Sequence, residues 1–378
     1  TESQRLLTLF QQVYFFVKNN YVDEVEASTL IEGALTGMFE SLDDPHSAYL
    51  TKEEMRDLQD TTTGRFGGVG LYISKQNPDL SDEAEEEGYY RPYVEVVSPI
   101  EGTPAYRAGV HAGDYITAIN GESTEDLNID EVVKRLRGAP GSTVTVTILR
   151  GEDLVFDVEL ERAMVEVPTE RHAMIPGGIG YIRIIQFTPY TRERVRDALE
   201  DFQEKNYDSL IIDLRQNPGG LLTSVVDTAD LFFSGGEIVS TKSRVSKPES
   251  FTANPGSFVP SSVPIIVLID KGSASASEIL AGAMKDRDRA LLIGETTYGK
   301  GSVQQVRSIG QGGFRLTMSR YYTPSGDTID KVGVTPDVKI KEPEMTEEDM
   351  ESYQELISSR AIPKFIDENP DPSQSRID

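Results

Sequence analysis

Asp270-Lys-Gly-Ser-Ala-Ser-Ala-Ser-Glu278 is the segment from which the architecture of this chain is best inferred, together with the aliphatic run Ile265–Ile269 directly before it. Five aliphatic residues in succession predict a strand buried on both faces, as in a parallel sheet covered by helices. The small hydroxyl residues that follow predict a tight turn from this strand into a helix. Such a turn can hold a nucleophile exposed at the edge of the sheet.

A second informative segment, Thr297-Tyr-Gly-Lys-Gly-Ser-Val-Gln-Gln305, places glycine on both sides of Lys300. The chain has no cysteine and only three histidines, so a serine paired with a lysine is the simplest route to covalent catalysis. Ser275 is the candidate nucleophile, and Ser273 and Ser277 are its rivals. Lys300 accepts a serine proton only as the neutral amine, so its pKa must lie well below the usual value of about 10.4.

The neighbours of these two residues offer the other groups that acyl transfer requires. Gln304, four positions after Lys300, can hold the amine through a hydrogen bond. The oxyanion needs two main-chain N–H donors. Ala276 offers one at the positive end of a helix. The segment Asn217-Pro-Gly-Gly220 offers the other, because it too lies between a buried strand and a helix.

Each motif also has a purely structural interpretation. Ser-Ala-Ser-Ala-Ser is also a helix N-cap with small packing residues, and Gly-Lys-Gly is also a turn with a solvated lysine. Gly294-Glu-Thr-Thr-Tyr-Gly-Lys300 begins like a phosphate-binding loop, but Gly301 replaces the Ser or Thr that would hold magnesium, and a strand-like pattern follows. Nothing in the sequence points to a zinc site or a Ser-His-Asp triad at His46, His111 or His172, although the sequence excludes neither.

Composition limits the classes of function. The 378 residues carry 37 Lys+Arg against 63 Asp+Glu, a formal charge of -26, which argues against nucleic-acid and anionic-membrane partners. The absence of cysteine excludes disulfides and thiol catalysis. No apolar run reaches the length of about 18 residues that a membrane span needs, so no membrane anchor is visible. The chain begins at Thr1 rather than methionine, so we expect a mature or trimmed form that has lost any signal peptide.

Hydrophobic periodicity divides the chain into four parts. An N-terminal helical region covers 1–62, and short strands with glycine-rich turns cover 63–163. Aliphatic strands alternate with helices over 164–343, which is typical of an α/β layer. An acidic tail, 344–378, has a predicted helix at 346–358.

Taken together, these segments resemble the carboxyl-terminal processing (tail-specific) serine protease family with a PDZ domain. The resemblance covers nearly the whole chain, about 6–343, and its motifs occur in the family's order. They are Leu42-Asp-Asp-Pro-His-Ser-Ala-Tyr49, Gly67-Gly-Val-Gly70, Ala108-Gly-Val-His-Ala-Gly-Asp114, Gly180-Tyr-Ile-Arg-Ile184, Asp213-Leu-Arg-Gln-Asn-Pro-Gly-Gly220, Gly272-Ser-Ala-Ser-Ala-Ser-Glu278, Gly299-Lys-Gly-Ser-Val-Gln304 and Gly333-Val-Thr-Pro-Asp337.

The resemblance implies a ClpP/crotonase-like α/β protease core with an inserted PDZ domain, a small partly open β barrel, and an N-terminal helical region. It implies Ser275 as nucleophile, Lys300 as general base and Gln304 as the glutamine that supports the lysine. It places the oxyanion donors at Gly219 and Ala276.

The PDZ domain has its own physical logic. The amides of Gly68, Val69 and Gly70 can hold a terminal carboxylate, while the strand that begins at Leu71 pairs with an extended peptide. Substrates would then be presented by their C-terminal tails. Relatives use the domain to gate the active site, which implies a peptide-driven switch here.

Two departures from the family pattern stand out. Asp43-Asp44 doubles an aspartate that occurs once in the family motif. A polar insertion at 75–92 contains Glu83-Ala-Glu-Glu-Glu87; it is either a solvated loop or a charge that disfavours acidic tails, so the substrate preferences of relatives are not carried over.

The sequence thus predicts a serine endopeptidase that cleaves proteins near exposed, mostly apolar C-termini and needs no metal or nucleotide. The resemblance places it in the bacterial periplasm or cell envelope, and helices at both ends favour a homodimer. The alternative is a latent or degenerate protease that acts as a PDZ peptide-binding scaffold.

Overall fold

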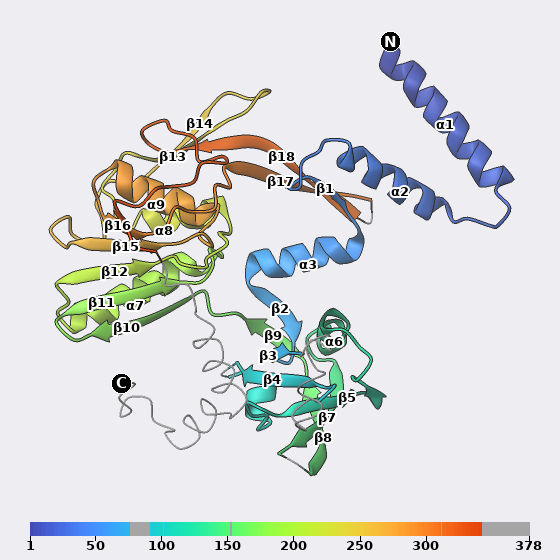
Figure 1. Ribbon diagram of the computed structural model, residues 1–378, viewed down its shortest axis with the longest axis horizontal. Helices are drawn as coiled ribbons and strands as arrows, with labels where there is room; N and C mark the ends of the chain where they lie inside the picture. The colour runs from blue at the N-terminus through green and yellow to red at the C-terminus, as the bar shows by residue number, and fades with distance from the viewer. Residues whose placement is uncertain (76–90, 101, 152, 311, 342–378) are drawn as a thin grey trace. The chain divides into compact units, whose positions relative to one another are not determined.

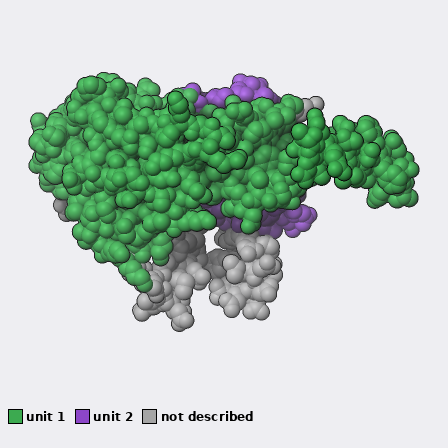
Figure 2. All heavy atoms as spheres, turned by 90° about the horizontal axis from the view of Figure 1, so that it is seen from above, with its two compact units in different colours: residues 1–64, 168–341 green, residues 65–167, 342–378 purple. Residues whose placement is uncertain are grey.

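The computed structural model describes residues 1–75, 91–100, 102–151, 153–310 and 312–341 (Figure 1). The chain forms two compact units, shown in green and purple in Figure 2. Unit 1 comprises 1–64 and 168–341, and the described part of unit 2 is drawn from 65–167. The predicted helix at 346–358 and nearly all of the insertion at 75–92 lie outside the described residues.

A six-stranded sheet forms the core of unit 1 within the described residues, in the order β10-β11-β12-β15-β16-β19. All neighbours run parallel except β10 and β11. Ile182, Ile212 and Val267 are fully buried in it, so the aliphatic runs form a parallel sheet as predicted. The strands are β10 (Glu170–Ile175), β11 (Ile179–Ile184), β12 (Ser209–Asp213), β15 (Ile265–Ile269), β16 (Leu291–Gly294) and β19 (Val338–Lys339).

Three helices accompany this sheet, and their buried residues share one core with its strands. Helical periodicity in the sequence predicts a helix over 221–233, but the helix observed there is shorter. It ends at Ala229, and Leu231, Phe232 and Phe233 enter the core from the turn that follows. The helices are α7 (Thr191–Glu204), α8 (Leu222–Ala229) and α9 (Ala276–Asp286).

A second sheet of unit 1 joins segments that are far apart in the sequence (Figure 1). The strand-like pattern after Lys300 is confirmed as β17, which pairs with β18. The N-terminal region was expected to consist of helices with a turn at 42–49, yet Ala48–Leu50 is a strand that pairs with β18. A three-residue strand is too short to show a period, and its partner lies far along the chain. The elements are α1 (Glu2–Asn20), α2 (Ala27–Glu40), β1 (Ala48–Leu50), α3 (Lys52–Thr63), β13 (Glu237–Lys242), β14 (Glu249–Thr252), β17 (Ser302–Ile309) and β18 (Gly312–Tyr322).

Unit 2 is an antiparallel β unit with two short helices in its described part. Its larger sheet has the order β3-β4-β5-β7-β8, with β6 on β5, and β2 pairs with β9. The Asn120-Gly121 pair in the sequence predicts a tight hairpin, which is confirmed, because both residues adopt positive φ, 51° and 81°. The elements are β2 (Arg65–Gly68), β3 (Leu71–Ser74), β4 (Val94–Pro99), α5 (Pro104–Arg107), β5 (Tyr115–Ile119), β6 (Glu122–Ser123), α6 (Ile129–Leu136), β7 (Thr143–Arg150), β8 (Leu154–Glu161) and β9 (Ala163–Glu166).

Candidate active site

Ser275 lies where β15 turns into α9, as the sequence predicts. It is the N-cap of α9 and adopts φ 54° and ψ -112°, a strained conformation for a residue with a side chain. Its rivals have structural roles, since the Ser273 hydroxyl donates to the Leu214 carbonyl at 2.8 Å and the Ser277 hydroxyl to the Asn217 carbonyl at 3.0 Å. The Ser275 side chain instead forms a hydrogen bond with Tyr321, whose pKa burial raises to about 12.

Glu278, one turn into α9, connects the two candidate catalytic segments. Its Oε2 accepts the N–H of Ser275 at 2.8 Å and the N–H of Lys300 at 2.9 Å. Its Oε1 accepts the N–H of Gly299 and the hydroxyl of Thr297, each at 2.6 Å. Burial raises the pKa of this carboxyl group, and the hydrogen bonds oppose the rise. We did not predict this role, although Ser-x-x-Glu at a helix start is the pattern of a capping box.

Lys300 lies in a setting that favours its neutral form. Burial lowers the pKa of its ammonium, the Arg315 charge lowers it further, and Glu278 partly offsets both. Throughout the described residues, Lys300 Nζ has no hydrogen-bond partner. The structure therefore brings Ser275 and Lys300 together through their main chains and the Glu278 carboxylate, and no hydrogen bond joins their side chains.

The two predicted oxyanion donors lie beside Ser275 but differ in state. Ala276 is the first residue of α9, and its N–H donates to no acceptor in the described part of the chain. Gly219 adopts φ 106°, and a Cβ there would lie 2.8 Å from Ser275 Cβ and 3.0 Å from the Ala276 nitrogen. The Gly219 N–H, however, donates to Asn217 Oδ1 at 2.9 Å. In this conformation Gly219 lies beside Ser275, but its N–H is bound to the Asn217 side chain.

Hydrogen bonds connect the loop after β12, which carries Gly219, to the turn after β15, which carries Ser275. The Asp270 carboxylate, at the end of β15, accepts the N–H of Gln216 from the loop after β12 at 2.9 Å. It also accepts the N–H of Gly272 in its own turn at 2.9 Å. The Ala274 N–H in turn donates to the Asn217 carbonyl at 3.0 Å. These bonds set the spacing between Gly219 and Ser275.

Gln304 does not contact Lys300 by a hydrogen bond. Its Nε2 donates to Ser302 Oγ at 2.7 Å and to Thr317 Oγ1 at 3.3 Å. The sequence assigned no role to His46. It lies in a turn, and its main-chain carbonyl accepts a hydrogen bond from Arg315 Nε at 2.9 Å. Burial and the Lys300 charge lower the pKa of His46, so this turn lies near the candidate base.

In unit 2, the predicted peptide-binding residues Gly68, Val69, Gly70 and Leu71 line one groove of about 210 Å³. Gly70 adopts φ 81°, and a Cβ there would lie 2.3 Å from Thr103, so only glycine fits. The carbonyls of Val69 and Gly70 accept hydrogen bonds from the segment 100–105. Their N–H groups have no acceptor among the described residues, so they are available to a ligand.

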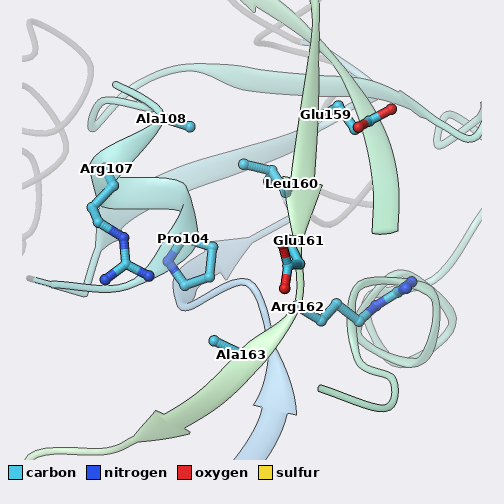
Figure 3. Close-up of a pocket in the computed structure, with 8 residues that line it drawn as sticks. All are labelled: Pro104, Arg107, Ala108, Glu159, Leu160, Glu161, Arg162 and Ala163. Atoms are coloured by element: carbon cyan, nitrogen blue, oxygen red, sulfur yellow. The ribbon is translucent and has the colours of Figure 1, made fainter. Parts of the chain in front are cut away.

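A second, open cavity of about 430 Å³ lies in unit 2 between α5 and the end of β8 (Figure 3). Arg107 and Arg162 line it, together with Glu159 and Glu161. Arg107 donates to the Gly102 carbonyl and Arg162 donates to three carbonyls. Because the lining carries charges of both signs and both arginines already donate to main-chain carbonyls, the cavity does not favour one class of ligand.

Within the described residues, no group of three or more His, Asp or Glu side chains is arranged to hold a metal ion. No described helix combines the length and the apolar character of a membrane span.

Comparison with known families matches three parts of the chain. Residues 178–340 match Peptidase family S41, residues 95–150 match the PDZ domain, and residues 1–54 match the N-terminal domain of the activating protease CtpB. The S41 match covers the central sheet from β11 onward, together with Ser275 and Lys300. The PDZ match lies within unit 2.

Proteins described as carboxy-terminal processing proteases are similar to this chain over most of their length. A carboxy-terminal-processing protease of Bartonella bacilliformis is 40% identical over 344 residues, 89% of this chain and 75% of that protein. CtpB of Bacillus subtilis is 33% identical over 353 residues, 91% of this chain and 70% of that protein. A solved photosystem II D1 C-terminal processing protease is 29% identical with a TM-score of 0.52, covering 94% of this chain and 97% of that one. This chain therefore belongs to the carboxy-terminal processing serine proteases of peptidase family S41, with a PDZ domain.

Proposed function

We propose that Ser275 and Lys300 are the catalytic dyad of this protease. The observation that carries the proposal is the Glu278 carboxylate, which binds the main chains of both residues through one oxygen. A lysine whose pKa is lowered by burial is more readily available as the neutral amine that a general base requires, and Ser275 lies in a strained, buried turn at the start of α9.

The reaction runs through an acyl-enzyme. Ser275 Oγ attacks the scissile carbonyl carbon while its proton passes to Lys300 Nζ. The tetrahedral intermediate collapses, the C–N bond breaks, and Lys300 returns the proton to the leaving amine. Water, deprotonated by the same amine, then attacks the ester carbonyl carbon. The C–O bond to Ser275 breaks, Lys300 returns the proton to Ser275 Oγ, and the new carboxyl terminus leaves.

The Ala276 N–H and Gly219 provide the oxyanion site in this proposal. Ala276 already offers a free donor at the helix N-terminus. Gly219 donates once its N–H leaves Asn217 Oδ1, which a small rotation of a glycine peptide allows. Donors aimed at the developing charge typically contribute 10²–10³ in rate.

Substrate selection falls to the groove of unit 2. The N–H groups of Val69 and Gly70 would bind a terminal carboxylate, and β3 would pair with the residues before it. Apolar walls from Ile73, Ile100 and Leu136 suit an apolar last residue. Peptide binding there would gate the protease, which lets an exposed tail mark a protein for cleavage.

Two further proposals concern the setting of the enzyme. Because relatives of the family act outside the cytoplasm, we assign it to the periplasm or cell envelope. Helix α1 has no buried residue, and Leu6, Leu7, Phe10 and Phe16 are 46–69% exposed. A second copy of this chain is the partner we propose for that surface, which makes the enzyme a homodimer.

Cleavage of an unfolded test protein with an apolar C-terminus tests the proposal. The wild-type chain is compared with Ser275→Ala and Lys300→Ala, each checked for cooperative thermal unfolding. Cleavage by the wild type and loss of at least 10³-fold in both variants supports the dyad. Equal cleavage by all three contradicts it, and the same test protein with an amidated C-terminus reports on the role of the groove.

A further inference from the structure

The side chain of Gln304 is held by a chain of hydrogen bonds that begins in the N-terminal segment. Asp44, in the turn before β1, accepts the hydroxyl of Ser47 at 2.6 Å and the N–H of His46 at 3.0 Å. Ser47 Oγ accepts the N–H of Thr317 at 3.0 Å. Gln304 Nε2 then donates to Thr317 Oγ1 at 3.3 Å.

This series of hydrogen bonds has a fixed donor-to-acceptor direction, because an ionised carboxylate can only accept hydrogen bonds. The single hydroxyl hydrogen of Ser47 goes to Asp44, so Ser47 has none left for Thr317. Thr317 Oγ1 lies 3.5 Å from Ser47 Oγ, and a hydrogen bond from the Thr317 hydroxyl helps to lower the pKa of the Asp44 carboxyl group, so Thr317 is the donor on this side. Its Oγ1 is left as an acceptor and requires a donor on its other side.

This direction decides how the Gln304 amide is oriented. Its NH₂ group has two hydrogens, and the two oxygens near it, on Thr317 and Ser302, use both. A flipped amide would place its carbonyl against the Thr317 oxygen, whose hydrogen is already committed to Asp44. Gln304 Oε1, four residues after Lys300, is thereby kept as an acceptor that receives no hydrogen bond from any described residue.

We propose that Asp44 is a positioning residue of the active site, which acts through Ser47 and Thr317 to orient the Gln304 amide so that its Oε1 receives an N–H of Lys300. With one N–H held by Oε1, the lone pair of the neutral amine is directed to Ser275. The inference rests on the proposed dyad and adds the N-terminal segment to its active site.

The doubled aspartate supplies a matched control. Asp43 is exposed and adopts φ 51°, a conformation that asparagine accepts as readily as aspartate. Of the two aspartates, Asp44 is the one whose side chain accepts hydrogen bonds from described residues. Asp44→Asn introduces a donor at the start of the chain and breaks its direction, whereas Asp43→Asn changes the same charge next to it and leaves the bonds intact.

The test measures kcat and KM of tail-peptide cleavage for Asp44→Asn, Asp43→Asn, Thr317→Val and Thr317→Ser, with melting temperatures for each. Asp44→Asn and Thr317→Val should lower kcat about 10-fold at unchanged KM, the effect of one lost hydrogen bond. Asp43→Asn and Thr317→Ser should stay within twofold of the wild type, because Thr317→Ser keeps the hydroxyl.

Unchanged kcat in both Asp44→Asn and Thr317→Val overturns the inference and leaves the dyad standing. Equal losses in Thr317→Ser and Thr317→Val also overturn it, since packing rather than the hydroxyl would then matter. A wild-type chain without Ser275-dependent cleavage overturns the dyad and, with it, this inference.

Discussion

Ser275 and Lys300 donate their main-chain N–H groups to the same oxygen, Oε2 of Glu278, at 2.8 and 2.9 Å. The proposed nucleophile and base are 25 positions apart in the sequence, and one buried carboxylate binds the main chains of both. Since this carboxylate accepts two further hydrogen bonds, from Thr297 and Gly299, it holds the whole lysine loop against the N-terminus of α9.

Replacing Glu278 should therefore impair both activity and stability. In Glu278→Gln an NH₂ group faces donors that need an acceptor, so we expect a loss of about 1–3 kcal/mol in the free energy of unfolding and at least 10-fold in kcat. Glu295→Gln is the control, because the one ion pair that Glu295 makes with a described residue is with Lys271, whose side chain is 77% exposed. Equal melting temperatures for the two variants would contradict the role of Glu278.

Gly219 should not tolerate a side chain. In Gly219→Ala the methyl group meets the Ala274 carbonyl and Ser275 Cβ at 2.8 Å and disfavours φ 106°, so cleavage should fall at least 10²-fold. Gly256→Ala is the control for backbone strain alone, since Gly256 has φ 89° and open space around it. The proposal on the oxyanion site fails if both variants keep wild-type kcat.

The buried Lys300 predicts a pH-dependent stability. Its pKa in the folded protein is below the ordinary 10.5, so between these two values the unfolded chain binds more protons and stability rises with pH. Lys300→Met should melt about 2–4 °C higher than the wild type near pH 7. This gap should narrow as the pH approaches 10, and a constant gap from pH 6 to 10 would show that Lys300 is not destabilised by burial.

The exposed face of α1 predicts a dimer. Leu6→Glu with Phe10→Glu should convert the protein from two chains to one in light scattering, because both side chains are about half exposed and apolar. Gln11→Glu with Gln12→Glu adds the same charge to the same helix and should leave the mass at two chains. A wild-type mass of one chain at micromolar concentration would contradict the proposed homodimer.

Local signals made much of this structure predictable. The aliphatic run Ile265–Ile269 and the small residues after it predicted β15, the turn at Ser275 and α9, because strand, turn and cap are encoded within a few residues. The same holds for the hairpin at Asn120-Gly121 and for the glycine-rich edge of the peptide groove.

The features that could not be predicted from the sequence depend on hydrogen bonds between distant segments. The strand Ala48–Leu50 exists because it pairs with β18, and no period in three residues reveals it. The engaged N–H of Gly219 depends on the orientation of the Asn217 side chain, which a motif does not specify. Glu278 was visible as a capping residue, but its second bond, to Lys300, required the folded chain.

The central claim, that Ser275 attacks and Lys300 accepts its proton, is tested most directly by trapping the acyl-enzyme. An activated peptide ester is mixed with the wild type and with Lys300→Met, the reaction is quenched with acid, and the adduct is mapped by mass spectrometry across a pH series. We expect the adduct on Ser275, formed about 10-fold faster per pH unit below the pKa of Lys300, and at least 10³-fold slower in Lys300→Met. An adduct on another residue, or equal acylation rates in the two proteins, would contradict the account.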